Sequence, residues 1–278
     1  MRYVLTVLLF LPTLIWGQGN QNVDEEMSKL AWQSGPSVGQ IASKATINIP
    51  SGYLFLDEKN TSRFLELSGN PPRTGHYLLA PQSGKWWSVF SFSPSGYVKD
   101  DEKIDADALL KSLREGDAEG NEERKRLGMK AIFTDGWAVT PHYDEQTKRL
   151  EWGVRLKTEG GQFVTNYTAR LLGRTGVMSA VLVTGVDTLL SDSQEFKTSL
   201  QQFSFNSGEK YSEFKQGDKI AEYGLAALIL GGAAAVATKK GFWAVIAGFI
   251  AAFWKILVGF GIAAMAGLGK LFKSKKEQ

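Results

Sequence analysis

Few residues in this sequence have the type and spacing that catalysis requires. His142 lies just before Asp144, and a histidine–carboxylate pair can act as a general acid–base couple when it is folded against a nucleophile or a substrate. An acidic stretch earlier in the chain adds Asp100 and Asp101. The chain has two histidines and no cysteine, and it lacks the G-x-S-x-G, P-loop and H-E-x-x-H motifs. These four residues are the catalytic candidates, but the position of His142 beside a hairpin turn favours an exposed polar residue.

The acidic stretch could instead bind a metal, because hard cations prefer clustered carboxylate oxygens. Its carboxylates are Asp100, Asp101, Glu102, Asp105 and Asp107. Their spacing lacks the turn glycine and the terminal glutamate of a calcium-binding EF-hand loop. A solvated loop that ends in a helix N-cap at Asp105 explains the pattern better. The sequence therefore predicts no metal site and no cofactor.

Aromatic and basic residues offer candidates for a binding face. Trp137 belongs to a group of aromatic residues that could form a platform for a glycan or a peptide, although aromatic side chains on alternating strands more often belong to the core. Arg170 and Arg174 flank a short apolar run and could bind an anion or a lipid headgroup. An ion-pair bridge to the acidic stretch is an equally good interpretation of the two arginines.

Composition limits the class of protein. The chain has 278 residues, of which 43% are hydrophobic, so it can bury one substantial core besides any membrane segment. The net charge of +3 is small and much of the basic excess lies at the carboxyl end, whereas a nucleic-acid-binding domain would carry a basic face. We therefore expect no nucleic-acid partner. The absence of cysteine excludes a disulfide framework and a thiolate metal site.

The first half of the chain predicts strands interspersed with short helices. The predicted strands are Ala45–Ile49, Tyr53–Leu56, His76–Ala80 and Lys85–Ser93. The predicted helices are Thr61–Leu67, capped by Asn60, and Asp105–Leu113, capped by Asp105. Beyond the second helix, Gly116 and Gly120 predict a frayed continuation or two short helices.

The second half predicts a four-stranded antiparallel meander, with strands over residues 130–141, 150–157, 162–172 and 177–186. The second of these alternates apolar residues with polar ones such as Glu151 and Arg155, as expected for one buried and one solvated face. Pro141 is expected to end the first strand. The spacing of Ser191 and Gln194 predicts a capping box for a helix that covers the sheet. The fold class is therefore α+β, an antiparallel sheet with a few packed helices.

Apolar regions at both ends of the chain predict export and membrane attachment. Met1-Arg2 and the apolar run Tyr3–Trp16 have the pattern of a signal peptide, with small residues at Gly17 and Gly19 for cleavage. The predicted order is a signal peptide 1–19, a polar linker 20–27, an exported α+β domain 28–206, a connector 207–220, membrane helices 221–238 and 241–269, and a basic tail 270–278.

The two carboxyl-terminal segments predict a helical hairpin in the bilayer, since a spanning helix needs about 20 apolar residues. Lys239 and Lys240 separate the segments, and Trp243 suits the aromatic belt at the membrane interface. Lys255 lies inside the second segment and is expected to snorkel or to line a polar path. Small residues at every fourth position in both segments could pair helices and produce a homo-oligomer. The second segment either spans the bilayer or re-enters it, and the sequence leaves both open.

Several phrases occur in an order that resembles a known family. They are Trp32–Pro36, Ser68–Pro71, Gly96–Glu102, Gly136-Trp137, Pro141–Asp144 and Asn166–Met178. Their order is similar to that of a bacterial family of predicted membrane-anchored proteins with an uncharacterised domain, the domain of unknown function 2167. The resemblance implies an exported protein with a carboxyl-terminal anchor, and it transfers no activity or catalytic residue. The longest phrases direct attention to a binding face that includes Tyr97, Lys99, Asp100, Asp101 and Asn166.

Three functional hypotheses follow. The leading one is a non-enzymatic periplasmic module, anchored in the lipid bilayer of the bacterial inner membrane, that binds or assembles other envelope proteins. The second is a membrane-tethered hydrolase acting on an envelope substrate, which requires His142 and the acidic stretch to converge within hydrogen-bond distance in a pocket. The third is an oligomer of membrane helices with a polar path at Lys255.

Overall fold

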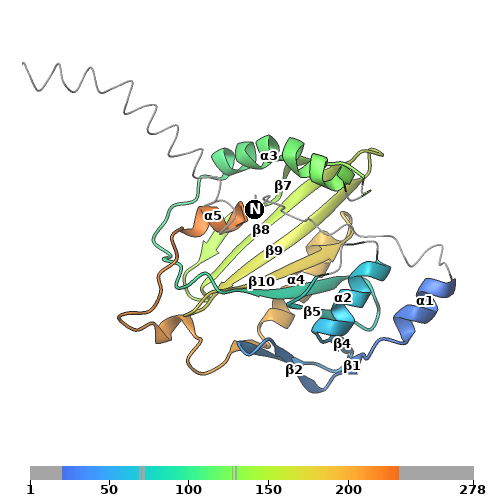
Figure 1. Ribbon diagram of the computed structural model, residues 1–278, viewed down its shortest axis with the longest axis horizontal. Helices are drawn as coiled ribbons and strands as arrows, with labels where there is room; N and C mark the ends of the chain where they lie inside the picture. Colours follow the sequence, from blue (N-terminus) through green and yellow to red (C-terminus); the bar gives the residue numbers. More distant parts are fainter. Residues whose placement is uncertain (1–20, 69, 71–72, 127, 129, 232–278) are drawn as a thin grey trace, which may run out of the picture. The chain divides into compact units, whose positions relative to one another are not determined.

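The computed structural model describes residues 21–68, 70, 73–126, 128 and 130–231 (Figure 1). Its largest element is an eight-stranded antiparallel sheet, which in spatial order contains β1 (Gln33–Ser34), β4 (Tyr53–Leu56), β5 (His76–Pro81), β6 (Trp87–Ser93), β10 (Val177–Thr184), β9 (Phe163–Leu172), β8 (Arg149–Thr158) and β7 (Ile132–Asp144). A three-stranded sheet contains β11 (Phe203–Phe205), β3 (Ala45–Ile49) and β2 (Ser37–Ile41). The helices are α1 (Gln21–Ser28), α2 (Glu58–Leu67), α3 (Ala106–Arg126), α4 (Leu189–Leu200), the 3₁₀ helix η1 (Tyr211–Glu213) and α5 (Leu225–Ile229). The predicted α+β class is confirmed.

The predicted meander is present, because β7, β8, β9 and β10 are consecutive in the chain and adjacent in the sheet. Val154 of β8 lies opposite Trp137 of β7 on one side and Asn166 of β9 on the other. β10 then pairs with β6, which joins the meander to the strands of the first half of the chain.

Alternation along β10 divides the core between the two faces of the large sheet. Met178, Ala180 and Leu182 point to one face, where they share a cluster with α4 and the small sheet. Val177 and Val183 point to the other face, which we call the α3 face. There α3 contacts β7, α2 contacts β4 and β5, and α5 packs at one end of the strip that β9 and β10 form between them (Figure 1). The rest of that strip carries no helix among the described residues.

α2 begins earlier than the sequence indicates. Its N-cap is Asp57, whose carboxylate accepts a hydrogen bond from the backbone N–H of Asn60 (2.9 Å). Asn60 itself lies in the first turn, and its side-chain oxygen accepts a bond from the backbone of Ala31 (3.0 Å). A carboxylate at the N-cap satisfies a helical N–H and faces the positive end of the helix dipole, which explains the earlier start.

α3 is one continuous helix and not the frayed or divided one that its glycines predict. A side chain at Gly116 or Gly120 would meet open space, so both glycines lie on the solvent side. Asp117 and Asn121, between and beyond them, hydrogen-bond to the edge strand β7. These tertiary bonds offset the helix-propensity cost of roughly 1 kcal/mol for each glycine.

The two other helix starts have different outcomes. Asp105 caps α3 as predicted, since its carboxylate accepts a bond from the N–H of Ala108 (3.0 Å). α4 begins at Leu189, before the predicted capping box, and the side chain of its N-cap Thr188 makes no capping bond. The hydroxyl of Ser191 donates to the carbonyl of Thr188 (2.9 Å), so Ser191 is a residue of the first turn and not a cap.

β7 continues through Pro141, where the sequence predicts its end. The pairing of β7 with β8 shifts register between Val139 and His142, and this irregularity surrounds the proline. β7 is also the outermost strand of the sheet. Edge strands and bulges are the positions at which a sheet tolerates a proline, because no ladder bond is lost.

The structured domain extends past both predicted boundaries. Residues 21–28, predicted to belong to the linker, form α1. Residues 207–220, predicted to be a connector, are held against the domain by η1 and its neighbours. Residues 221–231 are predicted to begin the first membrane helix, but the structure describes only a short helix there, α5, whose Leu225, Leu228 and Ile229 are buried in the domain core.

The remaining predictions for the chain ends lie outside the described residues. They concern the signal peptide 1–19, residues 232–238 of the first membrane helix, Lys239 and Lys240, the second membrane helix 241–269 with Trp243 and Lys255, and the tail 270–278. Within the part of the chain that the structure describes, no helix is long and apolar enough to cross a membrane.

Candidate functional site

His142 forms a histidine–carboxylate pair, but with Glu151. The two residues lie opposite each other on β7 and β8, and His142 Nε2 is 3.3 Å from Glu151 Oε2. The same carboxylate accepts a hydrogen bond from the hydroxyl of Tyr167 (2.6 Å) and lies 3.0 Å from Lys197 Nζ. Arg149 Nε is 2.6 Å from the other carboxylate oxygen. A single buried acid is therefore surrounded by cationic and neutral donors.

These contacts determine the pKa of Glu151. Burial alone would raise that pKa, but the hydrogen bond from Tyr167 and the charges of Arg149 and Lys197 outweigh burial and lower it below its usual value. Burial and the bond to Glu151 raise the pKa of the Tyr167 phenol. The carboxylate stays ionised and the phenol stays protonated at neutral pH. The cluster has the character of a structural ion-pair network that fastens α4, through Lys197, to the sheet.

Asp100 lies on the opposite side of the sheet from His142. Its Oδ2 accepts hydrogen bonds from the hydroxyl of Tyr143 (2.8 Å) and from the ammonium of Lys148 (2.7 Å). Tyr143 follows His142 on β7, so the alternation of the strand points the two side chains to opposite faces. Among the described residues, His142 and the acidic stretch therefore do not converge in the way that the hydrolase hypothesis requires.

The other predicted catalytic and binding residues of these regions have ordinary surroundings. Asp144 accepts hydrogen bonds from the backbone N–H groups of Thr147 (3.2 Å) and Gln146 (2.9 Å), which close the hairpin turn and lower the pKa of Asp144. Asp101 and Lys99 are exposed. No three His, Cys, Asp or Glu residues of the described ranges are grouped as metal ligands would be.

Tyr97, expected on a binding face, attaches the last described segment to the domain. Its ring stacks on Tyr211, with centroids 4.3 Å apart, and lies 4.2 Å from the ring centroid of Phe214. Its backbone N–H donates to the carbonyl of Lys219 (2.8 Å), and its carbonyl accepts from the N–H of Ala221 (2.9 Å). The segment that leads to α5 is thus paired with the chain beside Tyr97.

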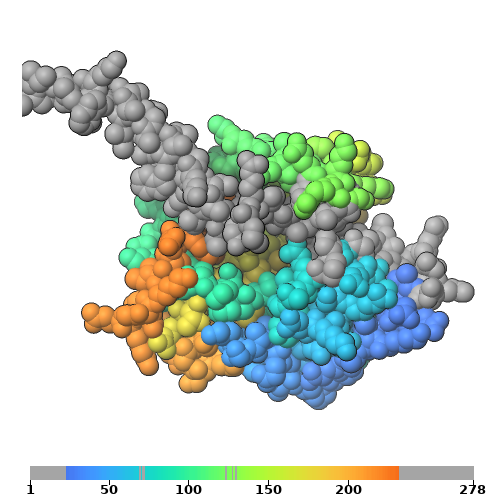
Figure 2. Space-filling model, viewed as in Figure 1, coloured from blue at the N-terminus to red at the C-terminus, as the bar shows by residue number. Residues whose placement is uncertain are grey.

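Glu102 completes this attachment at the N-terminus of α5. Its Oε2 accepts a hydrogen bond from the N–H of Ala226 (3.0 Å), which caps a helix whose own N-cap residue, Gly224, has no side chain. A side chain at Gly224 would overlap the Glu102 carboxylate. In Figure 2 the orange residues of this segment lie against the green residues that precede α3. The phrase Gly96–Glu102 therefore serves as a structural joint.

Arg174 is paired within the fold. Its guanidinium makes two hydrogen bonds to the carboxylate of Asp218 (2.6 and 2.7 Å) and a third to the carbonyl of Gly208 (3.2 Å). The pair lowers the pKa of Asp218 to about 2. Lys44 holds the same loop through Glu209, with 2.6 Å between the charged atoms. Arg174 is therefore a bridging arginine, although its partner is Asp218 and not the acidic stretch.

Trp137 is a core residue that positions α3. It is half-buried, packs in the cluster of the α3 face, and its Nε1 donates to the carbonyl of Ala106 at the start of α3 (3.0 Å). This agrees with the core interpretation of the aromatic residues. The described contacts of Trp137 do not identify it as part of a binding platform.

Asn166 and Arg170 are the candidate binding residues that have buried polar atoms without hydrogen-bond partners. Asn166 is 2% exposed, and neither the oxygen nor the nitrogen of its amide has a partner. The Nε of Arg170 is buried and also has none, while the guanidinium carbon lies 5.8 Å from the ring centroid of Trp152. Each buried unpaired polar group costs about 1–3 kcal/mol, so native proteins rarely keep one without a reason.

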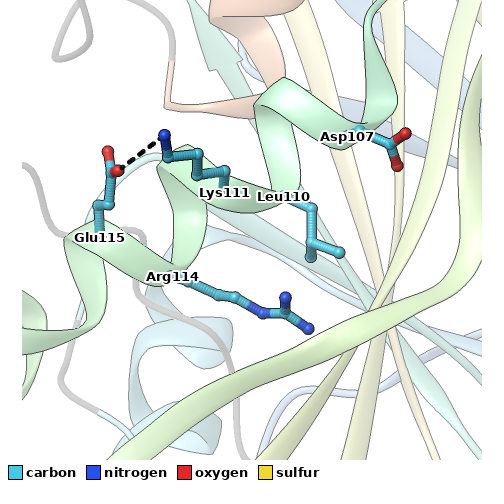
Figure 3. Close-up of a pocket in the computed structure, with 5 residues that line it drawn as sticks. All are labelled: Asp107, Leu110, Lys111, Arg114 and Glu115. Atoms are coloured by element: carbon cyan, nitrogen blue, oxygen red, sulfur yellow. Dashed lines mark ion pairs between the residues drawn. The ribbon is translucent and has the colours of Figure 1, made fainter.

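A hollow of about 420 Å³ lies along α3 (Figure 3). It is lined by Asp107, Leu110, Lys111, Arg114 and Glu115. Lys111 and Glu115 pair with each other at 3.9 Å and are exposed. Arg114 extends from the helix toward β7, where it donates to the carbonyl of Thr134 (3.3 Å). Because its arginine and lysine already have partners, this hollow does not define a binding site.

Glu151 is the residue that sequence reasoning missed. It lies on the polar side of β8, and the sequence predicts that this side faces solvent. The signal that could have identified it is the hairpin turn predicted beside His142, because a tight hairpin there sets His142 opposite Glu151.

These features define an α+β protein built on a broad antiparallel sheet, in which the catalytic candidates are separated and two polar residues of one face stay unpaired. The chain belongs to the family described as protein of unknown function (DUF2167), whose model matches residues 33–263. The family resemblance recognised in the sequence is thereby confirmed. No curated protein matches the sequence.

The solved structures that match include one of low similarity. It is the solution structure of cyanobacterial PsbP (CyanoP) from Synechocystis sp. PCC 6803, with a TM-score of 0.35 and 10% sequence identity over 63% of this chain and 91% of that chain. A likeness at this level carries no argument about function.

Proposed function

We propose that this protein is a non-enzymatic binding or assembly module of the bacterial envelope, with its domain on the periplasmic side and its carboxyl-terminal apolar residues in the inner membrane. The separation of His142 and Asp100 onto opposite sides of the sheet supports a non-enzymatic role. The family match continues to residue 263, so most of the apolar carboxyl-terminal sequence belongs to the matched region. Other envelope proteins are the partners that such a location offers.

The burial of α5 carries the proposal about the anchor. Leu225, Leu228 and Ile229 lie in the domain core, and Glu102 caps the helix that holds them. Residues that pack in a protein core are not available to face lipid. This leaves residues 232–238 as the apolar remainder before Lys239, which is far short of the about 20 residues that a span needs.

The segment 241–269 is then the one apolar run long enough to cross the bilayer. We therefore propose a single span in place of the hairpin that the sequence predicts. This segment exceeds the required length, so Lys255 can lie toward one end of the span and snorkel to the headgroups. A single span also places Lys239 and Lys240 on the domain side and the lysine-rich tail 270–278 on the other. The positive-inside bias then favours a cytoplasmic tail and a periplasmic domain, which agrees with the signal-peptide pattern.

Membrane extraction of two chains tests the proposal. We expect the full chain to stay with the membrane pellet after alkaline extraction, and a chain that stops after Lys240 to be released in soluble, folded form. The shorter chain keeps every described residue, so its circular dichroism and protease resistance report whether the domain is intact.

The two alternatives have different outcomes in the same experiment. A hairpin whose first helix covers 221–238 predicts that the chain ending after Lys240 stays in the membrane. Release of the full chain by alkali would contradict membrane anchoring altogether. Either result would require a different account of the carboxyl end.

A further inference from the structure

We infer that Arg170 and Asn166 bind a polyol phosphate, such as glycerol phosphate, either as a free ester or as the headgroup of a phospholipid. The inference rests on the proposed binding role of the domain and does not depend on the anchor. It assigns a ligand class to two residues that the described fold positions and leaves without hydrogen bonds.

Arg170 supplies a positive charge that the fold does not neutralise. The structure gives it no hydrogen bond and no ion pair with a described residue, and its Nε is buried. Burial lowers the pKa of the guanidinium to about 10, which the nearby Tyr223 partly opposes. A guanidinium offers a planar set of N–H donors that matches phosphate oxygens. An anionic group is therefore the chemistry that Arg170 lacks.

Asn166 adds a donor and an acceptor on the same face of β9. Its amide nitrogen can donate to a phosphate oxygen, while its amide oxygen needs a hydroxyl or N–H from the ligand. An isolated phosphate would satisfy the nitrogen and leave the oxygen unpaired. A phosphate ester with a neighbouring hydroxyl satisfies both atoms. At 2% exposure Asn166 is shielded from bulk water.

The two side chains belong to one stretch of the α3 face. Strand alternation puts Asn166, Thr168 and Arg170 on the same side of β9. Thr168 lies between Arg170 and Asn166 on this face, and Trp152 lies opposite Thr168 on β8. The guanidinium of Arg170 lies over the Trp152 ring. Ser179, opposite Arg170 on β10, contributes a small polar side chain. This stretch belongs to the strip of the sheet between α3 and α2 (Figure 1).

Calorimetric titration of the full chain in detergent with glycerol 3-phosphate tests the inference, with glycerol as the neutral probe. We expect binding of glycerol 3-phosphate and not of glycerol. Arg170→Gln should weaken that binding at least about tenfold, as expected for the loss of hydrogen bonds to a charged group. The matched control is Arg155→Gln, which removes a cation from the neighbouring strand that is already paired with Asp135, and its affinity should equal that of the parent chain.

Asn166→Leu separates a binding role from a structural one. If the Asn166 amide only supports the fold, its replacement by leucine should lower the melting temperature. If the amide instead binds the ligand and is unpaired in the free protein, Asn166→Leu should raise the melting temperature and weaken the affinity for glycerol 3-phosphate. A fall in melting temperature would overturn the inference, as would absent binding by the parent chain or unchanged binding by Arg170→Gln.

Vesicles distinguish the two sources of the ligand. If the ligand is a lipid headgroup, the full chain should prefer vesicles of phosphatidylglycerol over phosphatidylcholine, and Arg170→Gln should abolish the preference. An unchanged preference together with lost glycerol 3-phosphate binding would assign the site to a free ester. Because alkaline extraction measures the anchor separately, failure of the anchor and failure of this site are distinguishable.

Discussion

Glu151 illustrates how the covering of a strand changes the role of a polar residue. On β8 it occupies the side that alternation assigns to solvent, yet α4 and β9 bury its side chain to 3% exposure. A buried carboxylate is stable only when donors surround it, and here Tyr167, Arg149 and Lys197 do so. The residue that faces His142 is therefore part of the framework.

Glu151→Gln should lower the free energy of unfolding at pH 7 by about 3 kcal/mol, because it removes the buried charge that pairs with the partly exposed Arg149 and Lys197. The folded-state pKa of Glu151 is below its usual value, so its contribution to stability is present above the unfolded-state pKa near 4.3 and is lost as the pH falls through the folded-state pKa. The variant should therefore lose less stability than the parent chain between pH 7 and pH 3, as measured by urea unfolding at both values.

Glu145→Gln is the control, because Glu145 is an exposed residue of the adjacent turn. It should change stability by less than about 0.5 kcal/mol at pH 7. Equal effects of the two substitutions would show that Glu151 does not hold α4 and the sheet together.

At the scale of elements, α3 protects an exposed edge of the large sheet. β7 is the outermost strand, and the unpaired backbone groups of an edge strand invite association with other chains. The amide of Asn121 exchanges two hydrogen bonds with the backbone of Ile132 (2.9 and 2.7 Å). The carboxylate of Asp117 accepts from the N–H (2.7 Å) and the hydroxyl (2.8 Å) of Thr134. Helix side chains thus take the place of a ninth strand.

Asn121→Ala and Asp117→Ala should each lower the free energy of unfolding by about 1–3 kcal/mol, since each leaves backbone groups of β7 unpaired. Hydrogen exchange should accelerate at the backbone amide of Ile132 in the first variant and of Thr134 in the second. Glu119→Ala, an exposed residue of the same helix, should leave both amides unchanged. Unchanged exchange in the first two variants would contradict the assigned role of α3.

The elements found from the sequence are those whose pattern is local. The meander was predicted because apolar residues alternate along β8 and turn residues separate the strands. β2 was missed because its burial depends on tertiary contacts: Gly39 lies against the ring of Phe55, and a side chain there would come within 3.0 Å of it. The length of α3 was missed for the same reason, since its glycines are compensated by bonds to β7.

The same limit applies to the candidate binding residues, because their types are local in the sequence but their partners are not. Residue types and spacing identified both Arg170 and Arg174 as possible anion-binding residues. What separates them is the partner that folding supplies, because Arg174 meets Asp218, which is 44 residues further along the chain, and Arg170 meets no acid among the described residues. Local sequence does not encode such a distinction.

At the scale of the whole molecule, the last described segment places the boundary between the domain and the proposed anchor later in the chain than the sequence predicts. The joint formed by Tyr97, Glu102 and α5 fixes the chain to the domain through Ile229. Residues 232–240 can extend over at most about 30 Å. On the proposed account the domain therefore stays close to the membrane surface, where its partners or phosphate-bearing ligands must also be.

The most direct test of this account measures on which side of the membrane each end of the segment 241–269 lies. The chain has no cysteine, so single Thr238→Cys and Ser274→Cys substitutions can be probed in spheroplasts with an impermeant thiol reagent, with Ser83→Cys in an exposed turn of the domain as the reference. A single span predicts labelling of the Ser83→Cys and Thr238→Cys variants, and of the Ser274→Cys variant only after permeabilisation. Protection of the Thr238→Cys variant, or labelling of the Ser274→Cys variant in intact spheroplasts, would contradict it.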